Sequence, residues 1–95
     1  MLSKEQVLFI ERTLAPFEPN YIGVFGSRAR GDHKMDSDLD LLVDFKKKLH
    51  LLDVISLEME LKNYFGFPVQ LVFRRSISSA IKPYILKDLK PVYGS

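Results

Sequence analysis

The chain has 95 residues, of which 46% are hydrophobic and 27% are charged, and 14 basic and 12 acidic residues leave a formal net charge of +2. This length supports one modest hydrophobic core, so we expect a single globular domain over residues 1–95. The lack of cysteine excludes a disulfide framework and a thiolate metal site. The charge balance is too small to argue for a nucleic-acid partner.

Membrane insertion and secretion are not indicated either. No apolar run approaches the roughly 20 residues that cross a bilayer, and the N-terminal segment MLSKEQVLFIERTL carries charges throughout, unlike a signal peptide. We therefore expect a cytoplasmic protein. The basic runs at 46–48 and 74–75 are typical of solvated loops, and aromatic residues are not interleaved with them as in many nucleic-acid-binding surfaces.

The first half of the chain predicts one helix and two strands. Ser3 and Gln6 have the spacing of a capping box, and apolar residues recur behind them at helical intervals, which predicts a helix over roughly 3–15. The short apolar segment YIGVFG, at 21–26, indicates a buried strand, and LDLLVDF, at 39–45, indicates a second one.

The second half predicts a longer helix, a third strand and a broken helical segment. Residues 51–65 have helical periodicity and are followed by glycine, while PVQLVF, at 68–73, indicates a strand. Residues 76–89 are helical in pattern but interrupted by Pro83, which predicts one turn around 77–81 and a second helix that starts with Pro83 at its first position. The segment PVY, at 91–93, is typical of a short edge strand. The order αββαβα predicts an α/β (α+β) fold, a small mixed sheet with helices packed against it.

A Gly-Ser turn ends the first predicted strand. Gly26 permits a close approach of the backbone, and a short helix beginning near Ser27 would direct free N–H groups outward. The serine hydroxyl can donate to a phosphate oxygen, and Arg28 and Arg30 add cationic groups whose planar forks suit phosphate. These residues are therefore candidate phosphate ligands, although a Gly-Ser pair after a strand is also an ordinary turn.

Two aspartates flank the start of the second strand. Because side chains alternate along a strand, Leu39, Leu41 and Val43 are expected to face a core, while Asp38 and Asp40 face the other way together. Residues two apart lie about 6.5–7 Å apart along a strand, so the two carboxylates can converge on a hard cation such as Mg²⁺. The alternative is an ordinary aspartate-rich loop that runs into a half-exposed strand.

Together, the segments Gly26–Gly31 and Asp36–Val43 resemble the GSxARG…SDxDLxV signature of the DNA polymerase beta nucleotidyltransferase superfamily, and most closely its minimal nucleotidyltransferases. The resemblance implies a nucleotidyltransferase fold in which Gly26 and Ser27 hold a triphosphate. It also implies that Asp38 and Asp40 act as catalytic metal ligands for Mg²⁺ in a two-metal site. The implied reaction transfers a nucleoside monophosphate, AMP from ATP, to an acceptor hydroxyl with release of pyrophosphate.

The same resemblance implies a partner. Minimal nucleotidyltransferases are commonly encoded beside helical HEPN-type toxins and serve as their antitoxins, and some add AMP to a tyrosine of the toxin. We therefore expect an antitoxin whose acceptor is a HEPN-type protein.

One position departs from the family pattern. A third carboxylate usually lies on the next strand, where this chain has Gln70, which cannot supply negative charge. Asp44 lies roughly 13 Å along the strand from Asp40, too far to share its ion. The sequence thus predicts binding of nucleotide and one Mg²⁺ with transfer slowed or lost. The alternative function is a weakened or inactive homologue that neutralises its partner by binding.

We expect the acceptor to be recognised through a partner, an oligomer or the exposed surface, because 95 residues leave no room for an added substrate domain. Four apolar residues near the C-terminus are candidates for a contact face or for simple core positions: Leu86, Leu89, Val92 and Tyr93. The sequence leaves the nucleotide preference and a homo-oligomer open.

Overall fold

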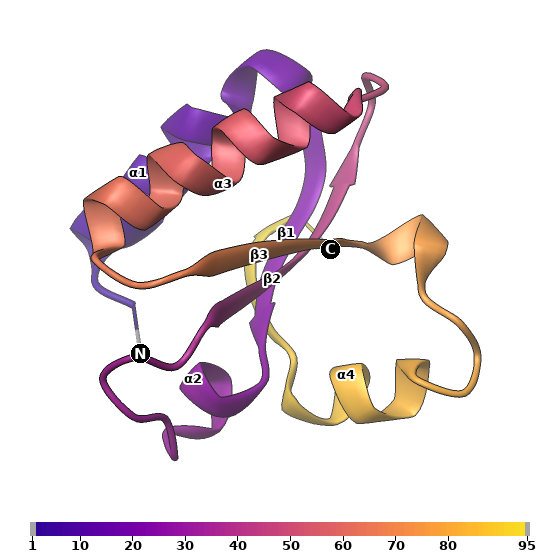
Figure 1. Ribbon diagram of the computed structural model, residues 1–95. Coiled ribbons are helices and arrows are strands. Elements are labelled where there is room, and N and C mark those ends of the chain that lie inside the picture. Colours follow the sequence, from indigo (N-terminus) through magenta and orange to yellow (C-terminus); the bar gives the residue numbers. More distant parts are fainter. Residues whose placement is uncertain (1, 95) are drawn as a thin grey trace.

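A computed structural model describes residues 2–94, so Met1 and Ser95 of the expected domain lie outside the described residues. A four-stranded mixed sheet has the order β3-β2-β1-β4, with β1 antiparallel to both neighbours and β2 parallel to β3 (Figure 1). The strands are β1 (Pro19–Phe25), β2 (Leu39–Phe45), β3 (Val69–Phe73) and β4 (Lys90–Gly94). The mixed sheet confirms the predicted α/β class.

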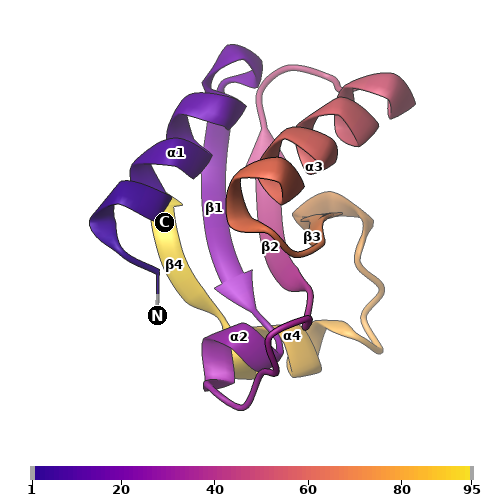
Figure 2. The same cartoon turned by 60° about the vertical axis from the view of Figure 1, so that its left-hand side comes forward.

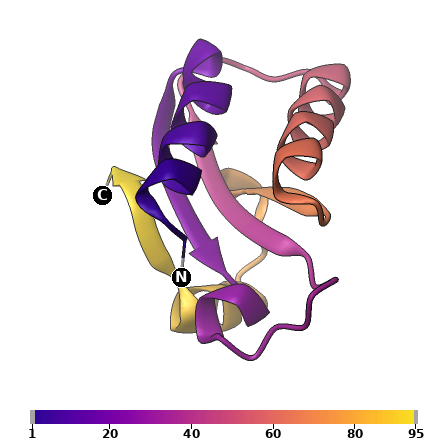
Figure 3. The ribbon, with the colours of Figure 1, turned by 90° about the vertical axis from the view of Figure 1, so that its left-hand side faces the viewer.

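The helices are α1 (Lys4–Leu14), α2 (Ser27–Arg30), α3 (Leu51–Phe65) and α4 (Lys82–Asp88), with 3₁₀ turns at Ala15–Phe17 and Arg74–Ser76. Helices α1 and α3 lie side by side over one face of the sheet, whereas α2 and α4 lie at one end of it (Figures 2 and 3). No helix within residues 2–94 combines the length and apolar character needed to span a bilayer.

Most element boundaries follow the sequence prediction. The capping box is confirmed, because the Gln6 N–H donates to the Ser3 hydroxyl at 3.1 Å and the Ser3 N–H donates to the Gln6 side chain at 2.8 Å. The first strand begins earlier than predicted, at Pro19, which pairs with Phe45 before a β-bulge. The predicted second helix is confirmed and begins at Lys82, with Pro83 in its first turn, where a residue without an N–H is tolerated.

The main core lies between the sheet and the pair α1 and α3. It contains Ile10 and Leu14 of α1, Ile22 and Val24 of β1, Leu39, Leu41 and Val43 of β2, and Leu57 and Leu61 of α3. The expected alternation along β2 is confirmed, because all of its odd-numbered residues are buried on this face. Burial of the leucines and valine therefore sets the direction of Asp40.

A smaller apolar cluster, formed by Tyr21, Leu42 and Ile85, lies on the opposite face of the sheet and holds α4. Gly23 permits this packing, because a Cβ there would lie 2.7 Å from both Leu89 Cδ1 and the Tyr21 hydroxyl. Leu89 packs against the cluster. This packing accounts for one of the four apolar C-terminal residues that the sequence singled out.

Leu89 and Val92 pack against the two cores, as expected of core residues. Leu86 and Tyr93 remain 48% and 46% exposed.

Candidate functional site

The two aspartates of the motif lie on and beside β2. Asp40 is half-buried and pairs in register with Phe25 of β1 on one side and Gln70 of β3 on the other. Asp38 precedes the strand and is exposed. Because β2 is paired with a strand on each side, the hydrogen bonds of the sheet fix the position of the Asp40 backbone.

The structure brings Asp40 directly against the Gly-Ser turn. Gly26 has φ 79°, and a Cβ at this position would lie 2.5 Å from Asp40 Oδ2. Only glycine therefore combines this backbone conformation with so close an approach of the carboxylate. The expected short helix begins at the next residue, so the N–H groups of Ser27 and Arg28 belong to its unbonded first turn.

Asp40 and Asp44 point from the same strand but have different surroundings. The carboxylate of Asp44 accepts from Arg75 at 2.7 Å and from Asn20 at 3.0 Å. Desolvation alone would raise the pKa of Asp44, but these hydrogen bonds and the arginine charge outweigh it and lower the pKa. Asp40 has the opposite balance, because burial and the negative charge of Asp38 raise its pKa, while Arg30 only partly offsets them.

Arg30 lies beside the carboxylates but is paired elsewhere. Its guanidinium contacts Asp88 at 2.7 Å and Asp32 at 3.1 Å, and the first of these ion pairs connects α2 with α4. Within residues 2–94, no ion pair engages Asp38 or Asp40. The two acids of the motif are thus left free to bind an external cation.

Arg28 makes a set of contacts that the sequence analysis missed. Its Nε donates to the Ser37 carbonyl at 2.9 Å, and its Nη2 donates to the carbonyls of Met35 at 3.1 Å and Lys34 at 3.4 Å. The guanidinium carbon lies 3.4 Å from the centroid of the Phe67 ring. Arg28 therefore holds the loop that precedes Asp38. Its role in phosphate binding stays a prediction, because the same guanidinium would have to give up some of these contacts to bind phosphate.

The third carboxylate is not restored by another residue. Gln70 is exposed opposite Asp40, and no group of three or more histidine, aspartate or glutamate side chains suited to a metal occurs in the described part of the chain. Glu58, on the following helix, accepts the Leu71 N–H at 2.8 Å and so protects the edge of β3. The donor set therefore fits one hard cation at Asp38 and Asp40 better than a pair.

The basic runs are partly engaged within the chain. Arg75 pairs with Asp44, the Arg74 guanidinium lies 4.1 Å from the Tyr21 ring centroid, and Lys47 lies 3.7 Å from Glu18. Each of these three basic side chains thus has a different partner within the chain. They therefore give no support to a nucleic-acid-binding surface.

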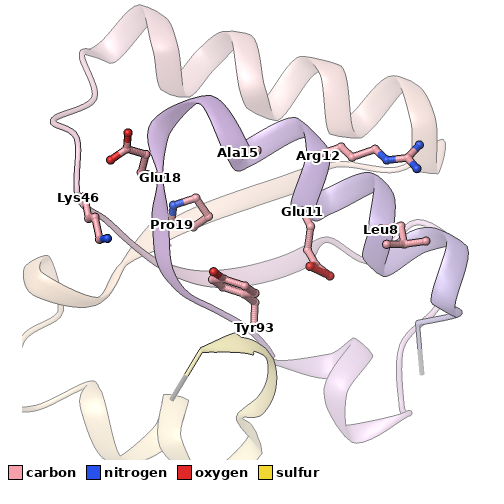
Figure 4. Close-up of a pocket in the computed structure, with 8 residues that line it drawn as sticks. All are labelled: Leu8, Glu11, Arg12, Ala15, Glu18, Pro19, Lys46 and Tyr93. Atoms are coloured by element: carbon pink, nitrogen blue, oxygen red, sulfur yellow. The ribbon is translucent and has the colours of Figure 1, made fainter.

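A hollow of about 520 Å³ lies apart from the aspartates, between α1, the start of β1 and β4. Leu8 and Lys46 lie at opposite ends of it, and Tyr93 lies below its centre (Figure 4). Its lining mixes acids, bases and apolar groups and shares no residue with the Gly-Ser turn. It therefore does not belong to the candidate site.

Comparison with known proteins agrees with this geometry. The family described as polymerase beta, nucleotidyltransferase matches residues 9–95. The protein adenylyltransferase MntA of Thermococcus cleftensis is 46% identical over 68 residues, which cover 72% of this chain and 69% of the relative. A solved minimal nucleotidyltransferase is 32% identical with a TM-score of 0.77, covering 93% of this chain and 90% of its own.

The fold also matches a toxin–antitoxin complex. In that structure, a tri-AMPylated HEPN toxin from Shewanella oneidensis is bound to an MNT antitoxin, and the match has a TM-score of 0.76 and 21% identity over 99% of this chain and 74% of the other. The fold is thus that of a nucleotidyltransferase. The chain belongs to the polymerase beta nucleotidyltransferase family, which confirms the resemblance seen in its two motifs. Membership implies a nucleotide substrate and a divalent metal.

The contacts of Arg28 generate a first prediction. Arg28→Lys should lower the free energy of unfolding by about 1–3 kcal/mol, because an ammonium cannot reach three carbonyls or stack as a guanidinium does. Hydrogen exchange of the amides at 34–38 should accelerate. Arg30→Lys is the matched control, since its exposed ion pairs contribute about 0–1 kcal/mol. Unchanged exchange in Arg28→Lys would show that the loop does not depend on this side chain.

A second prediction concerns Asp40 without metal. Because its pKa is raised in the folded protein, the folded state holds the proton more tightly than the unfolded chain, and stability falls as the pH rises above the ordinary value of 3.8. Asp40→Asn should therefore melt at a higher temperature than the wild type at pH 7, with the difference vanishing at pH values below 3.8. Asp44→Asn should have the opposite effect at pH 7, since it weakens the contacts with Arg75 and Asn20. A lower melting temperature for Asp40→Asn at pH 7 would contradict the electrostatic argument.

Proposed function

We propose that this protein transfers AMP from Mg-ATP to a hydroxyl of a partner protein, a tyrosine of a HEPN-type toxin, and thereby acts as its antitoxin. The observation that carries the proposal is the packing of the Asp40 carboxylate against Gly26, with Asp38 beside it and no ion pair to either acid in residues 2–94. This arrangement supports a cation site next to a phosphate-binding turn.

Each residue of the site has a chemical task. The oxygens of Asp38 and Asp40 would hold Mg²⁺, which when bound neutralises the triphosphate and orients it for in-line displacement. The Ser27 hydroxyl and the first N–H groups of α2 donate to phosphate oxygens, and Gly26 allows the backbone to approach them. The charge of Arg30 adds to the positive potential near the turn.

In the proposed reaction, the acceptor oxygen forms a bond to the α-phosphorus, while the bond to the bridging oxygen breaks and pyrophosphate leaves. The acceptor proton passes to solvent, because Gln70 has no basic group at neutral pH. The contribution of the protein is therefore positioning and electrostatic stabilisation without a covalent intermediate.

The choice of acceptor is supported by the relatives. The Thermococcus cleftensis relative is named a protein adenylyltransferase, and the Shewanella structure contains an AMPylated HEPN toxin with its antitoxin. A HEPN-type toxin is accordingly the partner that we propose for this chain.

Gln70 supports a second candidate function, in which the protein neutralises its partner by binding and transfers AMP slowly or not at all. The side chain lies opposite Asp40 in the parallel pair of strands, where a carboxylate could share a metal with it. A neutral amide leaves the acceptor hydroxyl without a base.

The proposed function predicts a mass shift. Wild-type protein mixed with Mg-ATP and its HEPN-type partner should add one or more AMP groups to the partner, detected by intact mass spectrometry. Asp38→Asn and Asp40→Asn should reduce the rate by at least about 100-fold, since each removes a ligand charge from the metal site. The matched control is Asp44→Asn, whose carboxylate is already paired. A stable complex that protects cells without any mass shift would support the binding function instead.

The departure at Gln70 predicts a gain of function. Gln70→Asp should raise the transfer rate by about 10- to 100-fold, because it places a third carboxylate opposite Asp40 and supplies a base. Single-turnover transfer with radiolabelled ATP measures the effect, and Gln70→Asn serves as the neutral control. An unchanged rate in Gln70→Asp would show that the missing carboxylate does not limit transfer.

A further inference from the structure

A hollow of about 470 Å³ lies beside the Gly-Ser turn, between α2 and α4. Its walls include Phe25 and Gly26 at the end of β1, and Ile81, Tyr84 and Ile85 at the start of α4. This volume falls in the range of about 300–1,000 Å³ that is usual for small-molecule sites. The hollow is therefore large enough for part of a nucleotide.

The wall contributed by α4 has an aromatic ring that is open to solvent. Ile85 is buried at 5% exposure and anchors the helix, whereas Tyr84 is 75% exposed and Ile81 is 54% exposed. A flat aromatic face together with an aliphatic side chain is the surface on which nucleobases stack. Covering exposed apolar surface of this kind with a planar ligand is favourable, because it removes apolar area from water.

The hollow shares Gly26 with the proposed phosphate and metal site. Gly26 lines the hollow and also supports the carboxylate of Asp40. The ion pair between Arg30 and Asp88, at 2.7 Å, joins α2 to α4 and so holds the two walls together. A triphosphate placed on the turn would therefore have this hollow within reach of its nucleoside end.

We infer that this hollow binds the base of the nucleotide, and that the ring of Tyr84 is its stacking surface. The inference rests on the proposed function, because it takes the position of the triphosphate from the Gly-Ser turn. It assigns nucleotide affinity to α4, an element outside both sequence motifs.

Arg30, Lys87 and Asp88 also line the hollow, but Arg30 and Asp88 are paired with each other, so we expect stacking to set the nucleotide preference. Stacking and apolar contact tolerate any base and increase with ring area, whereas hydrogen-bond readout selects one base. We therefore expect ATP and GTP to bind with similar affinity, CTP and UTP more weakly, and inorganic tripolyphosphate most weakly.

Titration calorimetry with ATP and with tripolyphosphate, both in the presence of Mg²⁺, tests the inference. Tyr84→Ala should weaken ATP binding by roughly 5- to 150-fold, the usual effect of removing one stacking ring, while tripolyphosphate affinity stays within about twofold. Tyr84→Phe should retain ATP binding because it keeps the ring. Tyr93→Ala is the matched control, since it removes a half-exposed tyrosine that lines the other hollow.

Nuclear Overhauser contacts between the Tyr84 ring protons and the base protons of bound ATP provide a second measurement, which requires no variant. Their presence supports the inference. Unchanged ATP affinity in Tyr84→Ala would overturn it, as would an equal loss for ATP and tripolyphosphate. A raised KM for the acceptor protein with unchanged ATP affinity would also overturn it, because the hollow would then belong to the acceptor.

Failure of the inference is distinguishable from failure of the proposed function. If the wild type binds neither Mg-ATP nor Mg-tripolyphosphate, the site at Asp38 and Asp40 is wrong and the inference fails with it. If the wild type binds both with equal affinity, the phosphate site stands and the base subsite does not exist.

Discussion

The site depends on the close approach of the Asp40 carboxylate to Gly26, where a Cβ would lie 2.5 Å from Asp40 Oδ2. Strand pairing on both sides of β2 holds the acid in place, and the glycine leaves the space that its oxygen occupies. Asp38 is close enough to repel it, and no cation in residues 2–94 forms an ion pair with either acid. The same β2 carries Asp44, whose partners Arg75 and Asn20 neutralise it. Asp44, near one end of β2, is thus paired with cations or amides, whereas Asp38 and Asp40, before and near its other end, have no ion-pair partner in residues 2–94.

The unpaired carboxylates of Asp38 and Asp40 lower the stability of the fold but provide charge that can bind a cation. Burial and repulsion destabilise the charged form of Asp40, and the apolar residues on the opposite face of β2 hold the strand in place despite this. A bound divalent cation converts the repulsion into attraction, so the free energy of metal binding includes relief of this cost. An asparagine at this position would stabilise the fold and remove the charge that the ligand needs.

Arg28 and helix α4 complete the surroundings of the acids. Arg28 belongs to the first motif, but its guanidinium donates to the loop carbonyls and stacks on Phe67, so it acts as a positioning residue for the loop that leads to Asp38. Helix α4 packs over the second apolar cluster and is joined to α2 through Arg30 and Asp88. Together they shape the space around a turn that the motifs only begin to define.

The sequence by itself determined the class of fold, the direction of the β2 side chains, the family and the lack of a third acid. These properties depend on local periodicity and on residue types at short spacing, such as the alternation of leucine and aspartate at 38–41. Only the tertiary structure decided that Arg28 holds a loop, that Arg30 joins two helices, and that Tyr84 and Gly26 line the same hollow. Those contacts connect residues that are 6 to 58 positions apart, or helices that meet only through packing. A guanidinium has the same charge whether it faces a phosphate or a carbonyl, and its orientation is set by neighbours that the linear pattern does not specify.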